Sequence, residues 1–179
     1  GIGNPKNAKS LLLSGATPPV MSLGVRDSMT TAVGTGFRFI QFHQPEPDEI
    51  RAVSAYIDSL KPARSPFVSK SGELSAAAKR GKEIFYSEQA GCSDCHPEPL
   101  YTDLQTYDVG TTGKYDRDQT NFDTPTLVEM FRSAPYLHDG SAVTMREALR
   151  DHNLEDRHGH VSHLTGQQLD DLCEYVLSL

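Results

Sequence analysis

The chain has 179 residues and a formal net charge of −7, with 24 acidic against 17 basic residues, three cysteines and no tryptophan. This length suits one ordinary domain or two small ones, and the composition excludes collagen, coiled coils and disulfide scaffolds. The acidic balance argues against a nucleic-acid partner, and no apolar stretch approaches the roughly 20 residues that a membrane helix needs.

The first part of the chain predicts two helices. A turn at Thr17-Pro18-Pro19 precedes a short amphipathic segment that contains Met29 and Ala32. A longer helix is predicted to start near Asp48, because apolar residues recur there at helical spacing. The residues on this face are Ile50, Val53, Ile57 and Leu60. The prolines at 62 and 66 then make residues 61–66 a linker.

A second amphipathic helix is predicted from about Ser75, and it leads into a C-x-x-C-H motif. The residues expected to face inward are Ala78, Gly81, Ile84 and Phe85. The motif is Cys92-Ser93-Asp94-Cys95-His96, the pattern of covalent haem attachment. Two thiols at this spacing can form thioethers to the two vinyl groups of one haem, and the adjoining histidine then lies beneath the iron as proximal ligand.

Three other interpretations of the motif are weaker. A zinc ribbon would need a second Cys or His pair, a redox-active C-x-x-C would start a helix after a strand, and a plain disulfide would not require His96. The sequence therefore predicts one covalent haem c, held by Cys92 and Cys95, with His96 on the iron.

The haem motif also predicts the compartment. Haem c is attached outside the cytoplasm, so we expect a periplasmic or other extracytoplasmic protein. Residues 1–5 have neither the basic start nor the apolar core of a signal peptide. We therefore expect either a processed mature form or a fragment of a longer chain.

The segment at 97–123 is rich in aspartate. Its aspartates are Asp103, Asp108, Asp116, Asp118 and Asp123, with glycines at 110 and 113. Oxygen ligands are what calcium prefers, so a calcium site is possible here. The aspartates lack the regular spacing of an EF-hand, and a solvated acidic loop is the favoured interpretation.

A low-spin haem needs a second axial ligand, usually methionine or histidine. His152 follows Met145, Ala148 and Leu149 at helical spacing, which places it on an apolar face toward the core. We interpret His152 as this distal ligand, with a core histidine bonded to a backbone carbonyl as the alternative. His158 is the second candidate.

The remaining histidines and methionines have simpler interpretations. His160 and His163 lie near His158 without helical spacing, so solvated loop residues are favoured over a metal cluster. Met130 and Met145 are the methionine alternatives for the iron, and both fit better as core residues.

The C-terminal helix repeats the helix near Asp48. It is predicted to start at Thr165, where Gln168 completes a capping box, and Cys173 is expected to be one of its buried residues. The ends of the two helices, at 56–60 and 175–179, share the pattern Tyr-(Ile/Val)-x-Ser-Leu. The two parts of the chain are therefore related.

This repeat predicts the domain organisation. The second copy follows a haem-attachment unit, whereas the first copy has none before it. We therefore expect residues 1–66 to form a partial, haem-free cytochrome-like half-domain with its linker. Residues 67–179 would form a mono-haem cytochrome c domain.

From about Ser75 to Leu179 the chain resembles the C-terminal haem domain of the bacterial di-haem cytochrome c peroxidase and MauG family. The resemblance rests on Gly91-Cys92-x-x-Cys95-His96 and on three further strings. They are Phe122-Asp123-Thr124-Pro125-Thr126-Leu127, Ala134-Pro135-Tyr136-Leu137-His138-Asp139-Gly140-Ser141, and Thr144-Met145-x-x-Ala148.

The resemblance implies two cytochrome c-like helical domains with one haem each. It places the distal ligand about one short helix after the His-Asp-Gly string, where His152 stands 14 residues after His138. His138 itself is expected to shape the loop at the haem edge by hydrogen bonding. The chain departs from the family in lacking a first C-x-x-C-H and the tryptophan that commonly relays electrons, which puts two-haem peroxidase chemistry within this chain in doubt.

The sequence thus predicts an all-α, cytochrome c-like domain around a covalent haem, with a partial second cytochrome-like helical segment. The expected function is one-electron transfer through a low-spin haem ligated by His96 and His152, between redox partner proteins. Two alternatives stay open. One is a peroxidase or MauG-like oxidase with an open haem site. The other is the electron-relay domain of a larger redox enzyme, completed by the rest of a longer parent chain or by another subunit.

Overall fold

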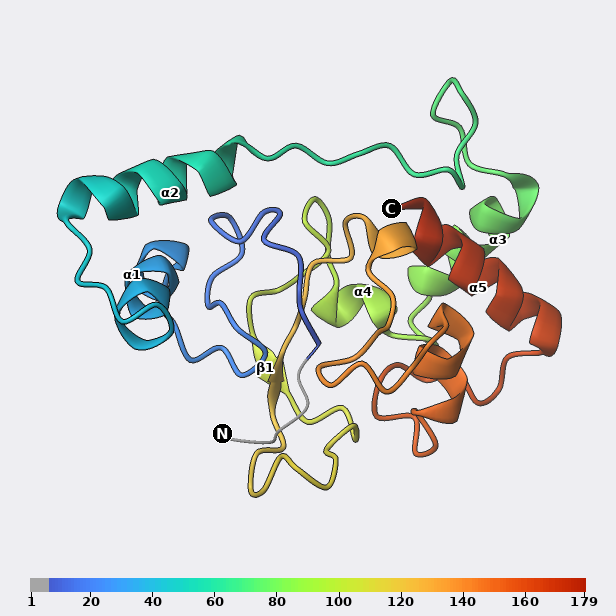
Figure 1. Ribbon diagram of the computed structural model, residues 1–179. Helices are drawn as coiled ribbons and strands as arrows, with labels where there is room; N and C mark the ends of the chain where they lie inside the picture. The colour runs from blue at the N-terminus through green and yellow to red at the C-terminus, as the bar shows by residue number, and fades with distance from the viewer. Residues whose placement is uncertain (1–6) are drawn as a thin grey trace.

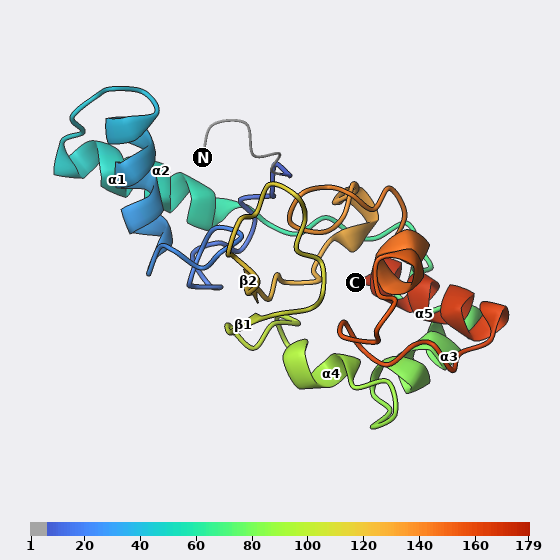
Figure 2. The ribbon, with the colours of Figure 1, turned by 90° about the horizontal axis from the view of Figure 1, so that it is seen from below.

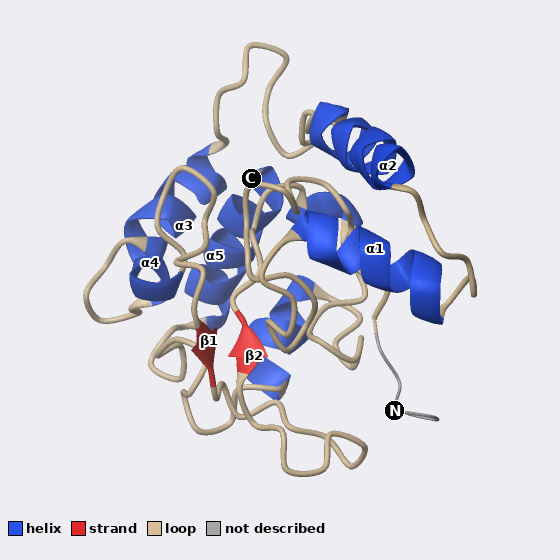
Figure 3. Ribbon diagram, turned by 90° about the vertical axis from the view of Figure 1, so that its left-hand side faces the viewer, coloured by secondary structure: helices blue, strands red, loops and turns tan. Residues whose placement is uncertain are grey.

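The computed structural model describes residues 7–179, and its regular secondary structure is mainly helical, with long loops between the helices (Figure 3). The helices are α1 (Met29–Phe39), α2 (Pro47–Ser59), α3 (Ala76–Phe85), α4 (Cys92–Cys95) and α5 (Gly166–Ser178), with a 3-10 turn η1 (Met130–Arg132) and a π-helical turn η2 (Glu147–Asp151). Strands β1 (Thr106–Tyr107) and β2 (Phe122–Asp123) form a small antiparallel sheet within the segment expected to be a loop. The protein is helical with little sheet, in keeping with the predicted class.

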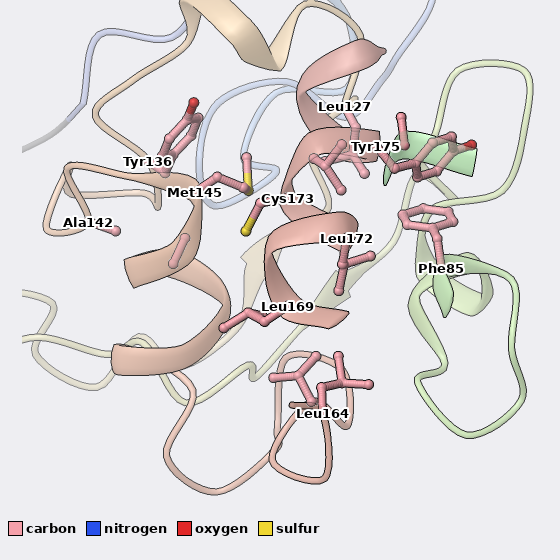
Figure 4. Packing of buried hydrophobic residues seen from close by; sticks show 14 residues of the cluster. Phe85, Leu127, Tyr136, Ala142, Met145, Leu164, Leu169, Leu172, Cys173 and Tyr175 are labelled. Atoms are coloured by element: carbon pink, nitrogen blue, oxygen red, sulfur yellow. The ribbon is translucent and has the colours of Figure 1, made fainter. Parts of the chain in front are cut away.

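The core of the molecule lies where α3 packs against α5 (Figures 1 and 4). Helix α3 begins after Ser75, whose hydroxyl accepts a hydrogen bond from the Ala78 amide. Its buried residues are Ala78, Gly81 and Phe85, as the periodicity predicted, and Ile84, predicted with them, is partly buried against the core. Phe85 meets Tyr175 of α5 edge to face, with ring centroids 5.3 Å apart. Each such aromatic pair contributes beyond the area it buries, so this contact fixes how the two helices cross.

Helices α1 and α2 form a second, smaller helix pair at the other side of the molecule (Figures 1 and 2). Their buried residues are Met29, Gly34, Ser54 and Ile57. Helix α2 starts with a capping box in which Glu46 and Glu49 each bond the backbone of the other. The pair buries few side chains compared with the core around α5.

Two connections join the helix pair to the rest. Within the linker, Ser65 is buried and its hydroxyl donates to the Leu177 carbonyl at 2.7 Å. On the other side, the Asp123 amide of β2 donates to the Ser22 carbonyl at 3.0 Å. The segment before α1 therefore rests on the small sheet, and the linker crosses the end of α5. No helix within residues 7–179 is long and apolar enough to cross a membrane.

Candidate haem-attachment site

The C-x-x-C-H motif forms a single helical turn, α4. Gly91 caps it in the left-handed conformation, with φ of 67°, which lets the chain turn sharply from Ala90 into the motif. The His96 amide closes the turn by donating to the Cys92 carbonyl at 3.0 Å. The turn brings both thiols and the imidazole of the motif into one short segment, as haem attachment requires.

The side chain of His96 is buried and oriented by one hydrogen bond. Its Nδ1 lies 2.8 Å from the carbonyl oxygen of Tyr101. A carbonyl oxygen can only accept, so Nδ1 carries the proton and Nε2 keeps the lone pair that a metal ligand needs. A bond of this kind fixes the tautomer and ring orientation of ligating histidines. Burial also lowers the pKa of His96, which favours the neutral form that binds iron.

Tyr101 supplies this carbonyl from a constrained position. Its φ of 52° lies in the left-handed region, which costs an ordinary residue about 1 kcal/mol or more. The phenol hydroxyl lies 3.2 Å from Glu98 Oε1 and 3.5 Å from the Tyr175 hydroxyl, and the ring meets Phe85 edge to face. The α3–α5 core thus holds the backbone that orients His96. Sequence reasoning missed Tyr101 because its contribution to His96 comes from the backbone.

The two motif cysteines are unpaired thiols in a half-buried setting. Burial raises the pKa of Cys92 to about 11 and also raises that of Cys95. A redox-active C-x-x-C requires a lowered thiol pKa, so the surroundings of this pair do not favour dithiol chemistry. Cys173 is buried in the core on α5, as predicted.

His152 lies at the end of the π-helical turn η2. Its amide donates to the Glu147 carbonyl at 3.0 Å, the i to i+5 bond that defines such a turn. Met145 and Ala148 before it are buried in the core, whereas His152 is half-buried. Within the part of the chain that the structure describes, no hydrogen bond engages its ring. Because the turn is π-helical, it aims His152 differently from the α-helical spacing used in the sequence prediction.

His158 lies in a loop that packs against the haem motif. The Asn153 side chain binds the His158 amide and the carbonyls of His158 and Gly159, and the His160 amide donates to the Ala90 carbonyl at 2.9 Å. The Nδ1 of His158 is buried without a hydrogen-bond partner among the described residues. Burial, and secondly the charge of nearby His96, lower the pKa of His158 to about 4. His158 therefore shares the surroundings of His96.

His138 forms a buried pair with Asp116. Its Nε2 lies 2.8 Å from Asp116 Oδ2, and its ring stacks on Phe122 with centroids 3.8 Å apart. The Asp116 carboxylate also accepts from the Gly113 amide. The pair ties the His-Asp-Gly loop to the aspartate-rich segment, in agreement with the expected hydrogen-bonding role of His138. Asp116 is thus buried, in contrast to the expectation of a solvated loop.

The donor set near α4 fits a haem c better than a bare metal ion. Two unpaired thiols precede a buried imidazole whose Nε2 is free to ligate, and this is what covalent haem attachment needs. Within residues 7–179, no group of three or more His, Cys, Asp or Glu residues is arranged to hold a metal ion.

Comparison with known proteins gives two kinds of relative. The chain is 31% identical over 232 residues to hydrazine synthase subunit gamma of Kuenenia stuttgartiensis, which covers all of this chain and 65% of that subunit. It is 28% identical over 134 residues to the methylamine utilization protein MauG of Methylorubrum extorquens, which covers 64% of this chain and 37% of that protein. The chain thus spans less than two thirds of the length of these relatives. No family model matches it.

Two solved structures share the fold. Hydrazine synthase of Kuenenia stuttgartiensis pressurized with xenon superposes with a TM-score of 0.89 and 29% identity, covering the whole of this chain and 74% of the other. A MauG-like protein associated with microbial copper homeostasis superposes with a TM-score of 0.73 over 98% of this chain and 73% of the other. At 19% identity, this second likeness shows the fold alone.

Proposed function

The chain belongs to the MauG-like di-haem cytochrome c peroxidase family, and from that premise we propose that it transfers single electrons through one covalently bound, low-spin haem c. The observation that carries the proposal is the hydrogen bond from His96 Nδ1 to the Tyr101 carbonyl, next to two unpaired thiols. When bound, a haem supplies an iron that cycles between two oxidation states. The chain's own residues decide whether that iron only exchanges electrons or also binds a small substrate.

Three residues would hold the group. Cys92 and Cys95 would anchor it through thioethers, and His96 would offer Nε2 to the iron. The Tyr101 carbonyl keeps the His96 ring in one orientation and raises its basicity as a ligand. Because the α3–α5 core fixes Tyr101, this ligand is held rigidly, which suits electron transfer without rearrangement.

A second histidine would close the site. We assign this role to His152, since it follows His138 by the interval at which the resembled family places its distal ligand, and its ring has no hydrogen bond to a described residue. His158 is the competing candidate because its Nδ1 is buried without a partner near His96. Two histidine ligands would give the iron a lower reduction potential than a histidine–methionine pair. The chain would then serve low-potential redox partner proteins.

Compartment and partners follow from the same proposal. Attachment of haem c outside the cytoplasm places the protein in the periplasm or an equivalent compartment. A relative named as a subunit of hydrazine synthase supports a place among partner subunits for this chain as well.

The rate of carbon monoxide binding distinguishes an electron carrier from an enzyme with an open iron site. A six-coordinate haem with two protein ligands should bind CO slowly, leaving the ferrous absorption spectrum unchanged over minutes. Rapid CO binding would overturn the electron-carrier proposal and favour the peroxidase or MauG-like alternative.

Substitution identifies the distal ligand. His152→Ala should convert the haem from low spin to high spin, visible in the absorption and electron paramagnetic resonance spectra. His158→Ala tests the competing candidate, and His163→Ala, at an exposed position, is the matched control. A low-spin spectrum retained in His152→Ala but lost in His158→Ala would move the assignment to His158.

A further inference from the structure

His138 has one ring nitrogen without a hydrogen-bond partner. Its Nε2 lies 2.8 Å from Asp116 Oδ2, and both side chains are 3% exposed. Its Nδ1 is buried as well, and no hydrogen bond from the described residues reaches it. A buried polar atom without a partner is costly, so nearly all such atoms in native proteins bind protein, water or a ligand. The Nδ1 of His138 therefore indicates a partner from outside residues 7–179.

The position of the His138 ring is fixed by its neighbours. Phe122 of β2 stacks on the ring with centroids 3.8 Å apart and an interplanar angle of 19°. The His138 carbonyl accepts a hydrogen bond from the Asn7 amide at 3.1 Å, and the Asp116 carboxylate accepts from the Gly113 amide at 2.8 Å. A buried and stacked ring has little freedom to turn toward another partner. Its Nδ1 is therefore preorganised, as the polar groups of binding sites are.

A short series of contacts connects His138 with the haem motif. Phe122 pairs with Tyr107 across the β1–β2 sheet (Figure 3), and directly paired residues have their side chains on the same face. Tyr107 in turn contacts Cys95. Burial and the charge of Asp103 raise the pKa of the Cys95 thiol, whereas a hydrogen bond with Tyr107 lowers it. The sheet thus places the His138 ring on the side of the site where Cys95 lies.

A haem c attached to the motif brings two carboxylates to this site. Its thioether bonds lie on two neighbouring pyrrole rings, and each of the other two rings carries one propionate. The pyrrole bonded to Cys95 therefore has a propionate-bearing ring as its neighbour. A carboxylate only accepts hydrogen bonds, and bonds between charged groups are stronger than those between neutral ones. A buried nitrogen of His138 that lacks a partner meets this need.

We propose that the Asp116–His138 pair binds one haem propionate, with His138 Nδ1 as the donor. The ring then donates from both nitrogens, as an imidazolium between two carboxylates. The inference rests on the haem attachment of the proposed function. It is independent of whether the iron carries electrons or binds a substrate.

The charges around the ring suit this arrangement. Charged side chains stand on each of the segments that pack around it, namely Asp116, Asp139, Asp123 and Lys9. A Cβ added to Gly113 would lie 3.4 Å from Asp116 Oδ2 and 3.6 Å from Asp139 Oδ2, so these two carboxylates are close to one another. A propionate that entered these surroundings without a cation beside it would be repelled. Protonated His138 supplies that cation.

The test observes the propionates directly in the haem-loaded protein. Growth on 5-aminolevulinate with ¹³C at its carboxyl carbon labels the two propionate carboxyl carbons of the haem. In the ferrous form, with carbon monoxide added if the iron is open, both carbons give ¹³C NMR signals whose positions follow their ionisation. One propionate should titrate about 1 pH unit or more below the other, because it faces a cation.

Matched variants identify the cation. His138→Phe keeps a ring that can stack on Phe122 but removes both nitrogens, so the midpoint of the low-titrating signal should rise by about 1 pH unit or more while the other signal stays. If this variant folds poorly, the double variant His138→Phe/Asp116→Asn also removes the buried carboxylate, and it should likewise lose the separation between the two signals. His163→Phe, at an exposed position, should leave both signals unchanged.

The outcomes separate this inference from the proposed function. Equal titration of the two propionates in the parent would overturn the inference, as would a separation that persists in the variant of His138 that folds. In both cases the attached haem remains, and the proposed function stands. A pyridine haemochrome spectrum that shows no covalently attached haem would instead overturn the proposed function, and the inference with it.

Discussion

The region around α5 and the region around α2 contain two similar helices in different environments. In both, a capping box starts 13 residues of helix and a serine hydroxyl bonds the last turn. In one, α3 buries Tyr175, while in the other Tyr56 stays exposed. The comparison shows that local signals determine where a helix begins and ends. Whether the remaining face of the helix is buried depends on which other segments pack against it.

The two regions also differ in how much holds them together. The cluster around α5 contains most of the buried apolar side chains of the described chain, including Phe85, Leu169, Leu172, Tyr175 and Val176. The α1–α2 pair buries few residues of its own. Regions with few buried contacts open at lower free energy than the global unfolding of the protein. We therefore expect the α2 region to be the less stable of the two in the isolated chain.

The largest predicted difference concerns the two equivalent tyrosines. Tyr175→Ala should lower the free energy of unfolding by about 3–5 kcal/mol, because it leaves a cavity beneath Phe85. Tyr56→Ala removes an exposed side chain and should change the free energy of unfolding by less than about 0.5 kcal/mol. Chemical denaturation of the haem-loaded variants, followed by circular dichroism, measures both. Similar losses of unfolding free energy in the two variants would contradict the inference that Tyr175 is buried and Tyr56 exposed.

A second prediction tests the close crossing in the α5 region. Gly81→Ala places a methyl group 1.9 Å from the Asp171 carbonyl oxygen, so α3 and α5 must separate. Overpacking of this kind costs about 1–3 kcal/mol, and the rigid backbone contact puts this variant at the upper end. Denaturation measures the loss. A variant as stable as the parent would show that the two helices can part without cost.

The haem motif and the main helices could be predicted from the sequence because their signals are local. Ser75, Thr165 and the Cys92–His96 motif each act within a few residues of themselves. The burial of Ala78, Gly81 and Phe85 also followed from periodicity, since one face of α3 meets a single partner. These features needed no knowledge of distant parts of the chain.

Other features of the site arise from contacts between distant segments. The Asp116–His138 pair joins residues 22 positions apart, and nothing near Asp116 in the sequence distinguishes it from the less buried aspartates around it. The π-helical turn before His152 differs from an α-helix by one hydrogen-bond step, and the apolar spacing does not reveal it. The Tyr101 carbonyl is invisible in a sequence because every residue has one. The uncovered face of α2 could not be foreseen either, since its periodicity matches that of a buried helix.

A third prediction concerns the seam where the segment before α1 meets β2. Burial raises the pKa of Asp123 to about 6, against the attraction of Lys9, which lowers it. The folded state therefore binds a proton more tightly than the unfolded state. Protonation of Asp123 therefore stabilises the folded state fully below about pH 4, and this stabilisation is lost as the pH rises through about 6. Above that pH the folded protein bears the cost of a half-buried carboxylate.

Asp123→Asn removes this cost. At pH 7.5 it should raise the free energy of unfolding by about 1 kcal/mol, a figure reduced because the side chain is only half-buried. Near pH 4 the variant and the parent should be equally stable. Denaturation at the two pH values measures the difference, with the exposed Asp118→Asn as control. A gain that is the same at both pH values would show that the carboxylate charge is not the cause.

The smallest predicted effect bears on whether the α2 region unfolds with the rest. A Cβ added to Gly36 of α1 meets nothing within 4 Å, so Gly36→Ala adds helix propensity without new contacts. This change should stabilise α1 by about 0.5–1 kcal/mol. If the two regions unfold as one unit, the midpoint of the single unfolding transition moves to higher denaturant concentration. If the α1–α2 pair opens first, hydrogen exchange slows in α1 and α2 while exchange in α5 is unchanged. We expect this second result because the pair buries so few side chains. Slowed exchange in α5 would show instead that the segment resting on β2 couples the two regions despite the uncovered face of α2.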